Sequence, residues 1–366
     1  MQSLLTSEQA LFAEAVERFV AREYGTGPGR PHHVFDRARL GRLAELGCLA
    51  LAIPPELGGI GGAVEAMIAL ERLAPALPPE PVVASAIHAA SALALAAPGA
   101  LAADLLPQVA EGELVLALAH FEEPARYRLA CVEARAEPAG SGFRLFGRKP
   151  LVAAATQADL FIVSAREAAS GRLSLFLVDP RRPGLTVLPR GRLDNMPAGD
   201  VHLDGCELGA EDRLDAMPAE AALEAASDRA EAAQIAEMVG LMDALTRTTI
   251  DYVRTRRQFG TPIGSFQALQ HRIADMWIAA EEARSLAFAA ALAVEGPEAE
   301  RARAVSMAKV RAIDAARLVG AEAIQLHGGI GMTDELIVSH WYKRLWALCA
   351  SLGDRRHHLA RLAAAA

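Results

Sequence analysis

The strongest constraint on the fold is a series of four long helical patterns that occupies the chain from about residue 217 onward. The first pattern runs to about Arg257 and carries an apolar stripe at helical spacing. The stripe comprises Ile235, Val239, Met242, Leu245, Ile250 and Val253. Glycine and proline breaks separate it from further helices predicted over about 266–294, 298–327 and from 337. Four long helices joined by short connections indicate an antiparallel bundle.

The first two thirds of the chain divide into a helical part and a part with short strands. Thr6 followed by Gln9 is typical of a helix start. Further helices are predicted over 36–47, 63–75, 80–97 and 100–111. Beyond residue 113, short apolar runs separated by turn residues predict strands over 142–147, 160–164, 173–178, 185–188 and 201–203.

These patterns predict an α+β protein with three domains. An N-terminal α-helical domain covers 1–113, a middle β domain of barrel-like form covers 114–216, and a C-terminal four-helix bundle covers 217–366. A chain of 366 residues has room for this number of domains.

Composition argues against several classes of protein. The chain is 52% apolar, enough for a large core, and its net charge of −8 argues against a nucleic-acid-binding protein. No uncharged apolar run reaches about 18 residues, so no membrane span is predicted. Glutamates within the first helical pattern argue against a signal peptide. The four cysteines form no CxxC pair, which favours reduced thiols and a cytoplasmic protein.

Two motifs carry the functional signal. One runs from Arg254 to Ile263 with the sequence RTRRQFGTPI, and the other runs from Gln325 to Glu335 with the sequence QLHGGIGMTDE. Both resemble signatures of the acyl-CoA dehydrogenase family, and the run PELGGIG at 55–61 is a third match. The resemblance covers essentially the whole chain. It implies the fold of that family, FAD as the cofactor and an acyl-CoA thioester as the substrate.

The resemblance also assigns residues to the cofactor. They are Arg256, Gln258, Phe259, Gln325, Gly328, Gly329 and Asp354. The first three fall at positions that contact the FAD of a neighbouring subunit, the next three meet its adenosine half, and the last falls where relatives bond the flavin. An arginine fork suits phosphate oxygens. From the residues alone, the arginines also fit a solvated helix end, and the glycines a helix cap and turn.

The middle domain departs from the family pattern in two places. Where many relatives have a Thr-Glu-Pro-Gly-x-Gly-Ser-Asp run, this chain has FEEPARY at 121–127. Where relatives often have Trp-Ile-Thr, it has PLVAAA at 150–155. Both changes remove hydroxyls that would bond the flavin and the acyl carbonyl region. Flavin binding by this domain is therefore expected to be weakened.

The residue expected to act as the catalytic base is missing. The family's reaction needs a carboxylate to remove the α proton of the thioester. Family members place it at the position of Leu352 or at that of Ala230, and neither side chain can accept a proton. Glu237 and Asp354 are weak substitutes. Glu231 points about 100° away from Ala230 on the helix and is expected to be a surface residue.

A subgroup of the family shares several of these departures. The runs KRL at 343–345, GD at 353–354 and HHL at 357–359 are similar to the small subunit of pimeloyl-CoA dehydrogenase and to related subunits of steroid side-chain degradation. Some such subunits work in heteromers in which only the partner chain holds the base. His357 and His358 lack the further ligands that a metal needs, so no metal site is predicted.

Three functions stay open at this point. The leading hypothesis is a subunit of an FAD-dependent acyl-CoA dehydrogenase that catalyses or assists α,β-desaturation, as a homodimer or as a hetero-oligomer with a homologue. The backbone N–H of Leu352 could then still polarise the thioester carbonyl. The second hypothesis is a catalytically silent partner that completes the cofactor site of an active homologue. The third is a flavin oxidase or monooxygenase on the same scaffold.

Overall fold

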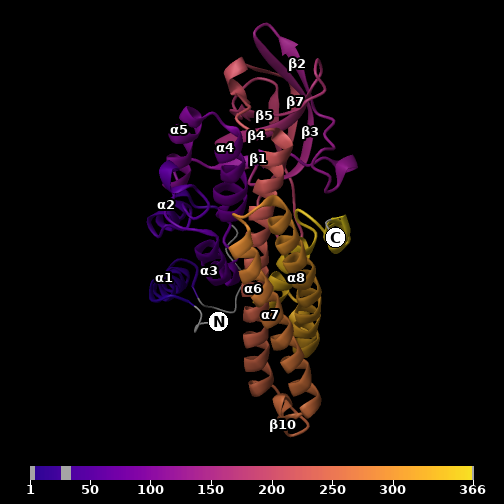
Figure 1. The fold of residues 1–366 in the computed structure, drawn as a ribbon. Coiled ribbons are helices and arrows are strands. Elements are labelled where there is room, and N and C mark those ends of the chain that lie inside the picture. Colours follow the sequence, from indigo (N-terminus) through magenta and orange to yellow (C-terminus); the bar gives the residue numbers. More distant parts are fainter. Residues whose placement is uncertain (1–4, 26–33, 365–366) are drawn as a thin grey trace. The chain divides into compact units, whose positions relative to one another are not determined.

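The computed structural model describes residues 5–25 and 34–364, and its N-terminal part is helical as predicted (Figure 1). Thr6 and Gln9 form a reciprocal capping box at the start of the first helix, which confirms the predicted helix start. The helices are α1 (Ser7–Glu23), α2 (Arg37–Glu45), α3 (Ala63–Leu73), the π-helical η4 (Val82–Ala89), α4 (Ala90–Ala96) and α5 (Gly99–Ala110).

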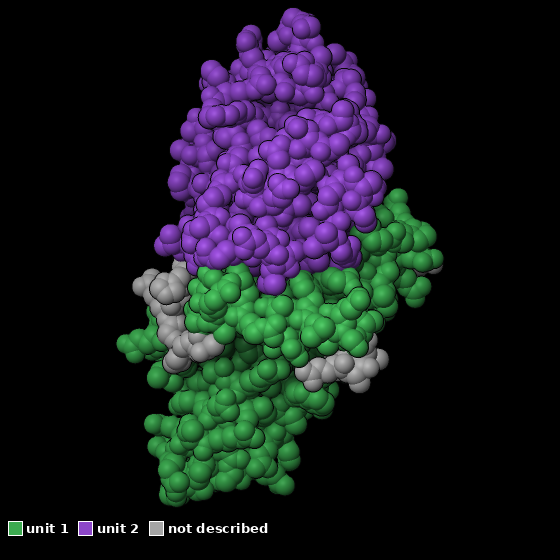
Figure 2. Space-filling view, turned by 90° about the vertical axis from the view of Figure 1, so that its left-hand side faces the viewer, with its two compact units in different colours: residues 1–33, 63–78, 231–366 green, residues 34–62, 79–230 purple. Residues whose placement is uncertain are grey.

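The chain folds into two compact units, which Figure 2 colours separately. The helical unit comprises residues 1–33, 63–78 and 231–366, and the sheet unit comprises residues 34–62 and 79–230. Both units are discontinuous in sequence, and the boundary at 230/231 lies inside helix α6 (Ala219–Thr255). The division into 1–113, 114–216 and 217–366 stays a prediction.

The sheet unit is built around eight strands. They are β1 (Leu116–Ala119), β2 (Arg135–Ala139), β3 (Gly142–Ala153), β4 (Leu160–Glu167), β5 (Leu173–Val178), β6 (Leu185–Pro189), β7 (Ala198–Leu208) and β8 (Arg213–Leu214). The hydrogen-bonded path runs β6-β7-β3-β2-β4-β5-β8, and β1 pairs in parallel with β4. Among the described residues this path does not close, because the two-residue β8 offers little edge for further pairing. The middle domain is therefore an open sheet, and the barrel-like form predicted for it is wrong.

The core of the sheet unit lies around β4. Phe161, Ile162 and Val163 are consecutive and fully buried, so both faces of this strand are covered. The helix η4 packs against the neighbouring β1, where the Ser85 hydroxyl accepts a hydrogen bond from the Leu116 amide at 2.9 Å. The strand β2 pairs with both β4 and β3 and so connects this buried strand to β3, which carries residues considered below.

The helical unit contains the predicted bundle. Its long helices are α6, α7 (Gln267–Ala293), α8 (Glu298–His327) and α9 (Ile337–Cys349), of which α6, α7 and α8 run side by side (Figure 1). A short hairpin, β9 (Arg257–Gln258) and β10 (Thr261–Pro262), joins α6 to α7, and a further helix α10 (Arg355–Ala364) follows α9. In the part of the chain that the structure describes, none of these helices has the length and apolarity needed to cross a membrane.

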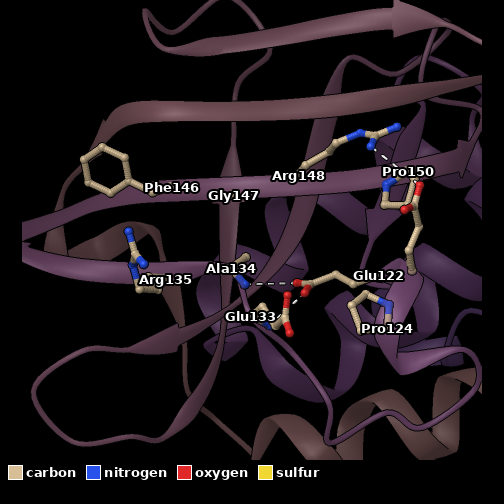
Figure 3. Close-up of a pocket in the computed structure, with 10 residues that line it drawn as sticks. Glu122, Pro124, Glu133, Ala134, Arg135, Phe146, Gly147, Arg148 and Pro150 are labelled. Carbon is tan, nitrogen blue, oxygen red and sulfur yellow. Dashed lines mark hydrogen bonds and ion pairs between the residues drawn. The ribbon is translucent and has the colours of Figure 1, made fainter.

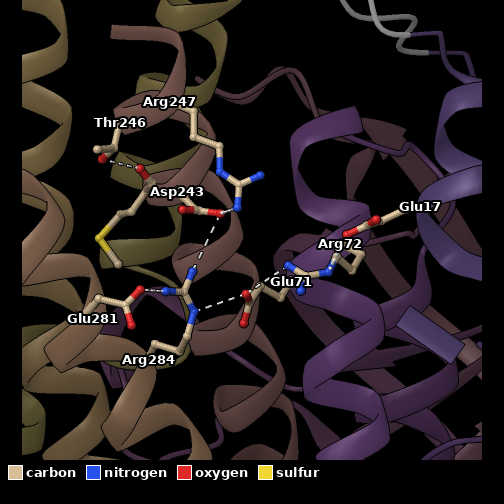
Figure 4. Close-up of polar contacts among 9 residues, drawn as sticks. Glu17, Glu71, Arg72, Asp243, Thr246, Arg247, Glu281 and Arg284 are labelled. Carbon is tan, nitrogen blue, oxygen red and sulfur yellow. Dashed lines mark hydrogen bonds and ion pairs between the residues drawn. The ribbon is translucent and has the colours of Figure 1, made fainter. Parts of the chain in front are cut away.

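A buried ion network links α3, α6 and α7 within the helical unit (Figure 4). The Arg284 side chain on α7 is 8% exposed and lies 3.1 Å from a carboxylate oxygen of Glu71 on α3 and 3.7 Å from one of Asp243 on α6. Gly240 on α6 makes this packing possible, because a Cβ there would lie 2.2 Å from the carbonyl oxygen of Glu71. Burying these charges is tolerable only because each has a partner.

We expect the substitution Arg284→Met to lower the free energy of unfolding by about 3 kcal/mol, because it removes the partner on α7 of the buried Glu71 carboxylate. Arg72 still contacts Glu71 at 3.2 Å, which keeps the loss at the lower end for a broken buried pair. The matched control is Arg247→Met, since Arg247 is 73% exposed beside the same Asp243 and should contribute less than about 1 kcal/mol. Urea denaturation measures both variants, and equal losses would contradict this account of the network.

Candidate functional site

The turn at Ser351–Gly353 between α9 and α10 carries Leu352, the residue at which the sequence resemblance predicts the family's base. Leu352 is partly exposed and has a φ of 61°, a left-handed conformation that a leucine adopts only when its surroundings impose it. Gly353 follows with no room for a side chain, because a Cβ there would lie 2.2 Å from Nε2 of His358. The backbone of this turn is therefore tightly determined, although its side chain carries no ionisable group.

Two buried side chains hold this turn. Gln234 on α6 donates from Nε2 to the Ser351 hydroxyl at 2.9 Å. Lys309 on α8, fully buried, donates from Nζ to the Ser351 carbonyl oxygen at 3.1 Å and to Oε1 of Gln234 at 3.2 Å. We call the closed triangle of Gln234, Lys309 and Ser351 the turn clamp. Burial lowers the pKa of Lys309, and the carboxylates of Glu231 and Glu237 oppose that shift.

The carboxylates near the turn clamp are already engaged. Glu237 makes two hydrogen bonds with Arg344 on α9, at 2.6 and 2.9 Å, so both of its carboxylate oxygens are committed to this ion pair. Asp354 caps α10 by accepting the amide of His357 at 2.8 Å. Glu231 is 2% exposed and lies 3.6 Å from Nε2 of His358, so the expectation that it is a surface residue is wrong.

That error has a simple cause. Glu231 lies three residues before Gln234 on α6, so both project from the same face of the helix, and this face packs against α8 and α10 instead of facing solvent. Ala230, the other position that relatives use for the base, is fully buried. Lys309 was not identified from the sequence, although a lysine within the apolar pattern of α8 is a signal that could have been used. Arg344 was noted only as part of the run KRL at 343–345, not as a partner of Glu237.

The residues assigned to a neighbouring subunit's FAD lie on the hairpin that follows α6. Arg256, Gln258 and Phe259 are exposed, and Phe259 is 92% exposed at a φ of 52°. The Ile263 amide donates to the Arg256 carbonyl oxygen at 2.8 Å, which closes the base of the hairpin. A fixed hairpin that presents an aromatic ring and a guanidinium to solvent is suited to contact another molecule.

The second assigned group lies at the C-terminal end of α8. Gln325, Gly328 and Gly329 are exposed, and a Cβ at either glycine would meet no atom within 4 Å. Tyr252 near the end of α6 donates to the carbonyl oxygen of His327 at 3.3 Å, and the two rings stack with centroids 4.4 Å apart. The structure thus brings both assigned groups to the same end of the bundle. The seventh residue, Asp354, lies at the other site, beside the turn clamp.

The sheet unit contains a second buried ion pair, behind the segment that departs from the family pattern. Lys149 on β3 is fully buried, and its Nζ lies 2.6 Å from Glu122 and 2.9 Å from the Ser164 hydroxyl. The Glu122 carboxylate also accepts the amides of Glu133 and Ala134. Burial lowers the pKa of Lys149 to about 8, against the opposing effect of Glu122. Ser164 further bonds Nδ1 of His120 at 2.9 Å.

A pocket of about 430 Å³ opens beside this ion pair (Figure 3). Its lining combines carboxylates, guanidiniums and one aromatic ring. The residues that line it are Glu122, Glu123, Pro124, Glu133, Ala134, Arg135, Phe146, Gly147, Arg148 and Pro150. The sequence indicated the segments 121–127 and 150–155, which supply Glu122, Glu123, Pro124 and Pro150, but not the residues at 133–135 and 146–148, because the pairing of β2 with β3 that brings residues 135 and 146 together was not predicted. Among the described residues, no cluster of three or more His, Cys, Asp or Glu side chains could hold a metal ion.

Comparison with known proteins places this fold and these motifs in a family. Residues 6–113 match the acyl-CoA dehydrogenase N-terminal domain, and residues 223–366 match the acyl-CoA dehydrogenase C-terminal domain. The chain belongs to the acyl-CoA dehydrogenase family, whose members are flavoprotein oxidoreductases that use FAD.

Individual relatives cover nearly the same length. The chain is 29% identical to acyl-CoA dehydrogenase IpdE2 of Mycobacterium tuberculosis, over 97% of this chain and 96% of that one. It is 30% identical to glutaryl-CoA dehydrogenase of Desulfococcus multivorans, over 82% and 80%. Among solved structures, it is similar to the ChsE4-ChsE5 complex of Mycobacterium tuberculosis, with a TM-score of 0.84, 27% identity and coverage of 100% and 98%.

The residues of the helical unit fit a bound dinucleotide. The absence of side chains at Gly328 and Gly329 leaves open space beside the backbone. Arg256 and Phe259 face solvent and are not packed into the core of the helical unit. The sheet unit fits less completely, because the segments 121–127 and 150–155 contain no serine or threonine hydroxyl that could bond a flavin. Arg256 would hold phosphate oxygens, and the glycine turn would admit the adenosine half.

The cluster around Lys149 predicts an acid sensitivity of the sheet unit. Burial and the nearby Lys149 ammonium hold the pKa of His120 well below its ordinary value of 6.5. The unfolded chain then binds a proton that the folded chain does not, so stability falls as the pH drops below 6.5. We expect His120→Gln to reduce this loss by up to about 1.4 kcal/mol per pH unit.

Urea denaturation between pH 7 and 5 measures this slope. Glutamine retains a polar atom for Ser164, so the variant should fold. The matched control is His271→Gln, at an exposed histidine. Parallel pH slopes for the wild type and His120→Gln would show that His120 does not carry the effect.

Proposed function

We propose that the chain is a subunit of an FAD-dependent acyl-CoA dehydrogenase that takes part in α,β-desaturation of an acyl-CoA thioester without supplying the base. The observation that carries this proposal is the turn at Leu352, whose backbone is firmly held while its side chain is hydrocarbon. Glu237 and Asp354 do not replace the base, because one is bound to Arg344 and the other caps α10. The proton acceptor then comes from another chain.

The Leu352 turn can still contribute to such a reaction through its backbone. A backbone N–H that the turn clamp holds in place can polarise the thioester carbonyl without reorganising when negative charge develops on its oxygen. The leucine side chain excludes water from the neighbourhood of that carbonyl. When bound, FAD supplies the acceptor for the hydride that leaves the β carbon.

The distance between the two sites of the helical unit supports a role in an oligomer. Gln234, which contacts the Leu352 turn, and Tyr252, which contacts His327, are 18 residues apart in α6, about 27 Å along its axis. The exposed hairpin at Arg256 lies beyond Tyr252. A flavin ring at the Leu352 turn would therefore have its own phosphates far from this hairpin, so the hairpin is better placed to serve the cofactor of a neighbouring subunit.

A hetero-oligomer is the assembly that we favour. A chain without a base gains most from a homologue that has one, and a chain 27% identical to this one was solved in the ChsE4-ChsE5 complex. In this arrangement the chain contributes its hairpin to the partner's FAD and receives the base for its own site, or serves only the partner's site.

The second candidate function is the catalytically silent partner. It is favoured by the sheet unit, whose segments 121–127 and 150–155 contain no serine or threonine hydroxyl to bond a flavin. The two functions differ in a simple property. A subunit that takes part in desaturation binds FAD at its own site and is yellow, whereas a silent partner gains flavin colour only in complex with the homologue.

We expect Leu352→Glu to create desaturase activity in the chain purified alone with FAD, because it places a carboxylate on a turn that is already fixed. General bases are worth about 10²–10⁴-fold in rate, so the gain should be large against the wild-type background. The assay follows reduction of an artificial electron acceptor with straight-chain, dicarboxylic and steroid acyl-CoA thioesters. Leu352→Gln is the control of equal size that cannot accept a proton.

The outcomes separate the alternatives. Activity in Leu352→Glu but not in Leu352→Gln supports a complete site that lacks only its base. Substantial activity of the wild-type chain alone, retained in the glutamine variant, would overturn the proposal of a missing base. A flavin-loaded wild type that consumes oxygen without acyl-CoA would instead favour an oxidase.

We expect Arg256→Ala to weaken FAD retention in the assembled oligomer roughly tenfold or more, because a charged hydrogen bond to phosphate contributes about 1.5–3 kcal/mol. The flavin-to-protein ratio after gel filtration and the FAD dissociation constant measure the effect. Arg254→Ala is the matched control, since Arg254 is an exposed arginine at the same helix end and is 74% exposed. Equal flavin loss in both variants would indicate a general charge effect instead of a specific contact.

A further inference from the structure

The strand β3 is interrupted where it carries an exposed leucine. The pairing of β3 with β7 shifts register between Lys149 and Val152, which marks a β-bulge at residues 150–151. Leu151 in this bulge has a φ of 52°, and 53% of its surface is exposed. A leucine gains nothing by itself from a left-handed backbone, nor from exposure to water, so both features need an external cause.

The cause of the backbone conformation is a buried carboxylate. Asp200 on β7 is 1% exposed, and its Oδ1 accepts the Leu151 amide at 3.0 Å. Its Oδ2 accepts from Arg148 at 2.6 Å and from Arg190 at 2.8 Å. One carboxylate therefore joins the bulge on β3 to β7 and to the segment after β6.

The two guanidiniums keep this carboxylate charged. Their hydrogen bonds, together with the bond from the Leu151 amide, hold the pKa of Asp200 well below its ordinary range. Arg148 and Arg190 are each about half exposed, so their free edges face solvent while the carboxylate stays buried. The Leu151 amide therefore has an ionised acceptor at neutral pH.

The exposed side chain of Leu151 lacks a corresponding explanation within the fold. An apolar side chain that is fixed by its backbone, and that stands out from a rigid strand, is suited to pack against a flat, uncharged ring. The flavin of the proposed function is such a ring, and the adjoining residues 152–155 are valine and alanine, which leave the ring room to approach.

We propose that Asp200 is a positioning residue for the flavin, because it fixes the bulge of β3 so that Leu151 packs against the ring. This inference rests on the proposed function, since it needs FAD bound at the chain's own site. In this proposal Asp200 on β7 makes no contact with the cofactor, and it acts through Leu151 on β3, which does.

The test uses the complete chain, with its partner subunit where the wild type needs one to bind FAD. Three variants separate the steps of the argument. Leu151→Ala removes the apolar contact and keeps every hydrogen bond of Asp200. Asp200→Asn keeps an acceptor for the Leu151 amide but removes the charge. Asp200→Ala removes both, and Asp212→Asn is the matched control, because Asp212 also pairs with an arginine and accepts a backbone amide, beyond the other end of β7.

We expect Leu151→Ala and Asp200→Ala to weaken FAD binding roughly ten- to hundredfold, as the loss of one buried leucine contact would. Both should also change the visible absorption spectrum of the bound flavin in the same way. The double variant should be no worse than Asp200→Ala, because Asp200 acts through Leu151. Asp200→Asn should fall between the wild type and Asp200→Ala, and Asp212→Asn should alter thermal stability without altering the spectrum.

The outcomes distinguish this inference from the proposed function. A wild type that binds no FAD, alone or with its partner, overturns the proposed function and this inference with it. A wild type that binds FAD, together with Leu151→Ala and Asp200→Asn variants of unchanged spectrum and affinity, overturns only the inference. Additive effects of the two alanine substitutions would also overturn it, since they would mean that Asp200 does not act through Leu151. The asparagine and leucine variants keep the test valid if Asp200→Ala does not fold.

Discussion

The helical unit depends on the buried ammonium of Lys309. A lysine without exposed surface costs a large desolvation free energy, and it remains in the core only because its Nζ is bound by the Ser351 carbonyl oxygen and by Gln234. These two bonds tie α8 and α6 to the turn that precedes α10. The left-handed conformation of Leu352 follows from this constraint, because the residue before it cannot move without leaving a buried charge unpaired. The hydrogen bonds that hold this turn come from the Ser351 carbonyl oxygen and hydroxyl and do not involve the side chain at 352.

The surroundings of that turn also limit which chemistry the chain can perform. Each carboxylate near it already has a structural partner: Glu237 binds Arg344, Asp354 caps α10, and Glu231 faces His358. Freeing any of them to accept a proton would cost the interaction that it now makes, and in a buried site that cost includes the partner left unpaired. The absence of a base at 352 is therefore not offset by a small side-chain movement. In the proposed function the proton acceptor therefore comes from a second chain.

The sequence was sufficient to predict the features that repeat along the chain. The long helices α6 to α9 and the strands β3 to β7 have a clear periodicity, and the open sheet differs from the predicted barrel only in how its edges end. The strands β1, β2 and β8 were missed because β1 does not alternate, β2 contains Pro138, and β8 has two residues. The engagement of Glu237, the burial of Glu231 and the role of Asp200 could not be predicted, because each depends on a partner from a distant part of the sequence, at 344, 358 and 151.

The two units hold a leucine by the same physical means. Leu352 and Leu151 both have left-handed backbones, and in each case a buried charged side chain from another element fixes the backbone beside or at the leucine. The free-energy cost of each strained leucine is thus offset by hydrogen bonds of Lys309 or Asp200, which do not involve the leucine side chain. The backbone conformation of each segment therefore does not depend on which side chain it carries. Lys309 or Asp200 fixes the backbone, and the residue at that position can be apolar, as in this chain, or acidic, as the resemblance predicts for the family's base. In a chain built in this way the backbone of a segment can keep its conformation while the side chain displayed there changes.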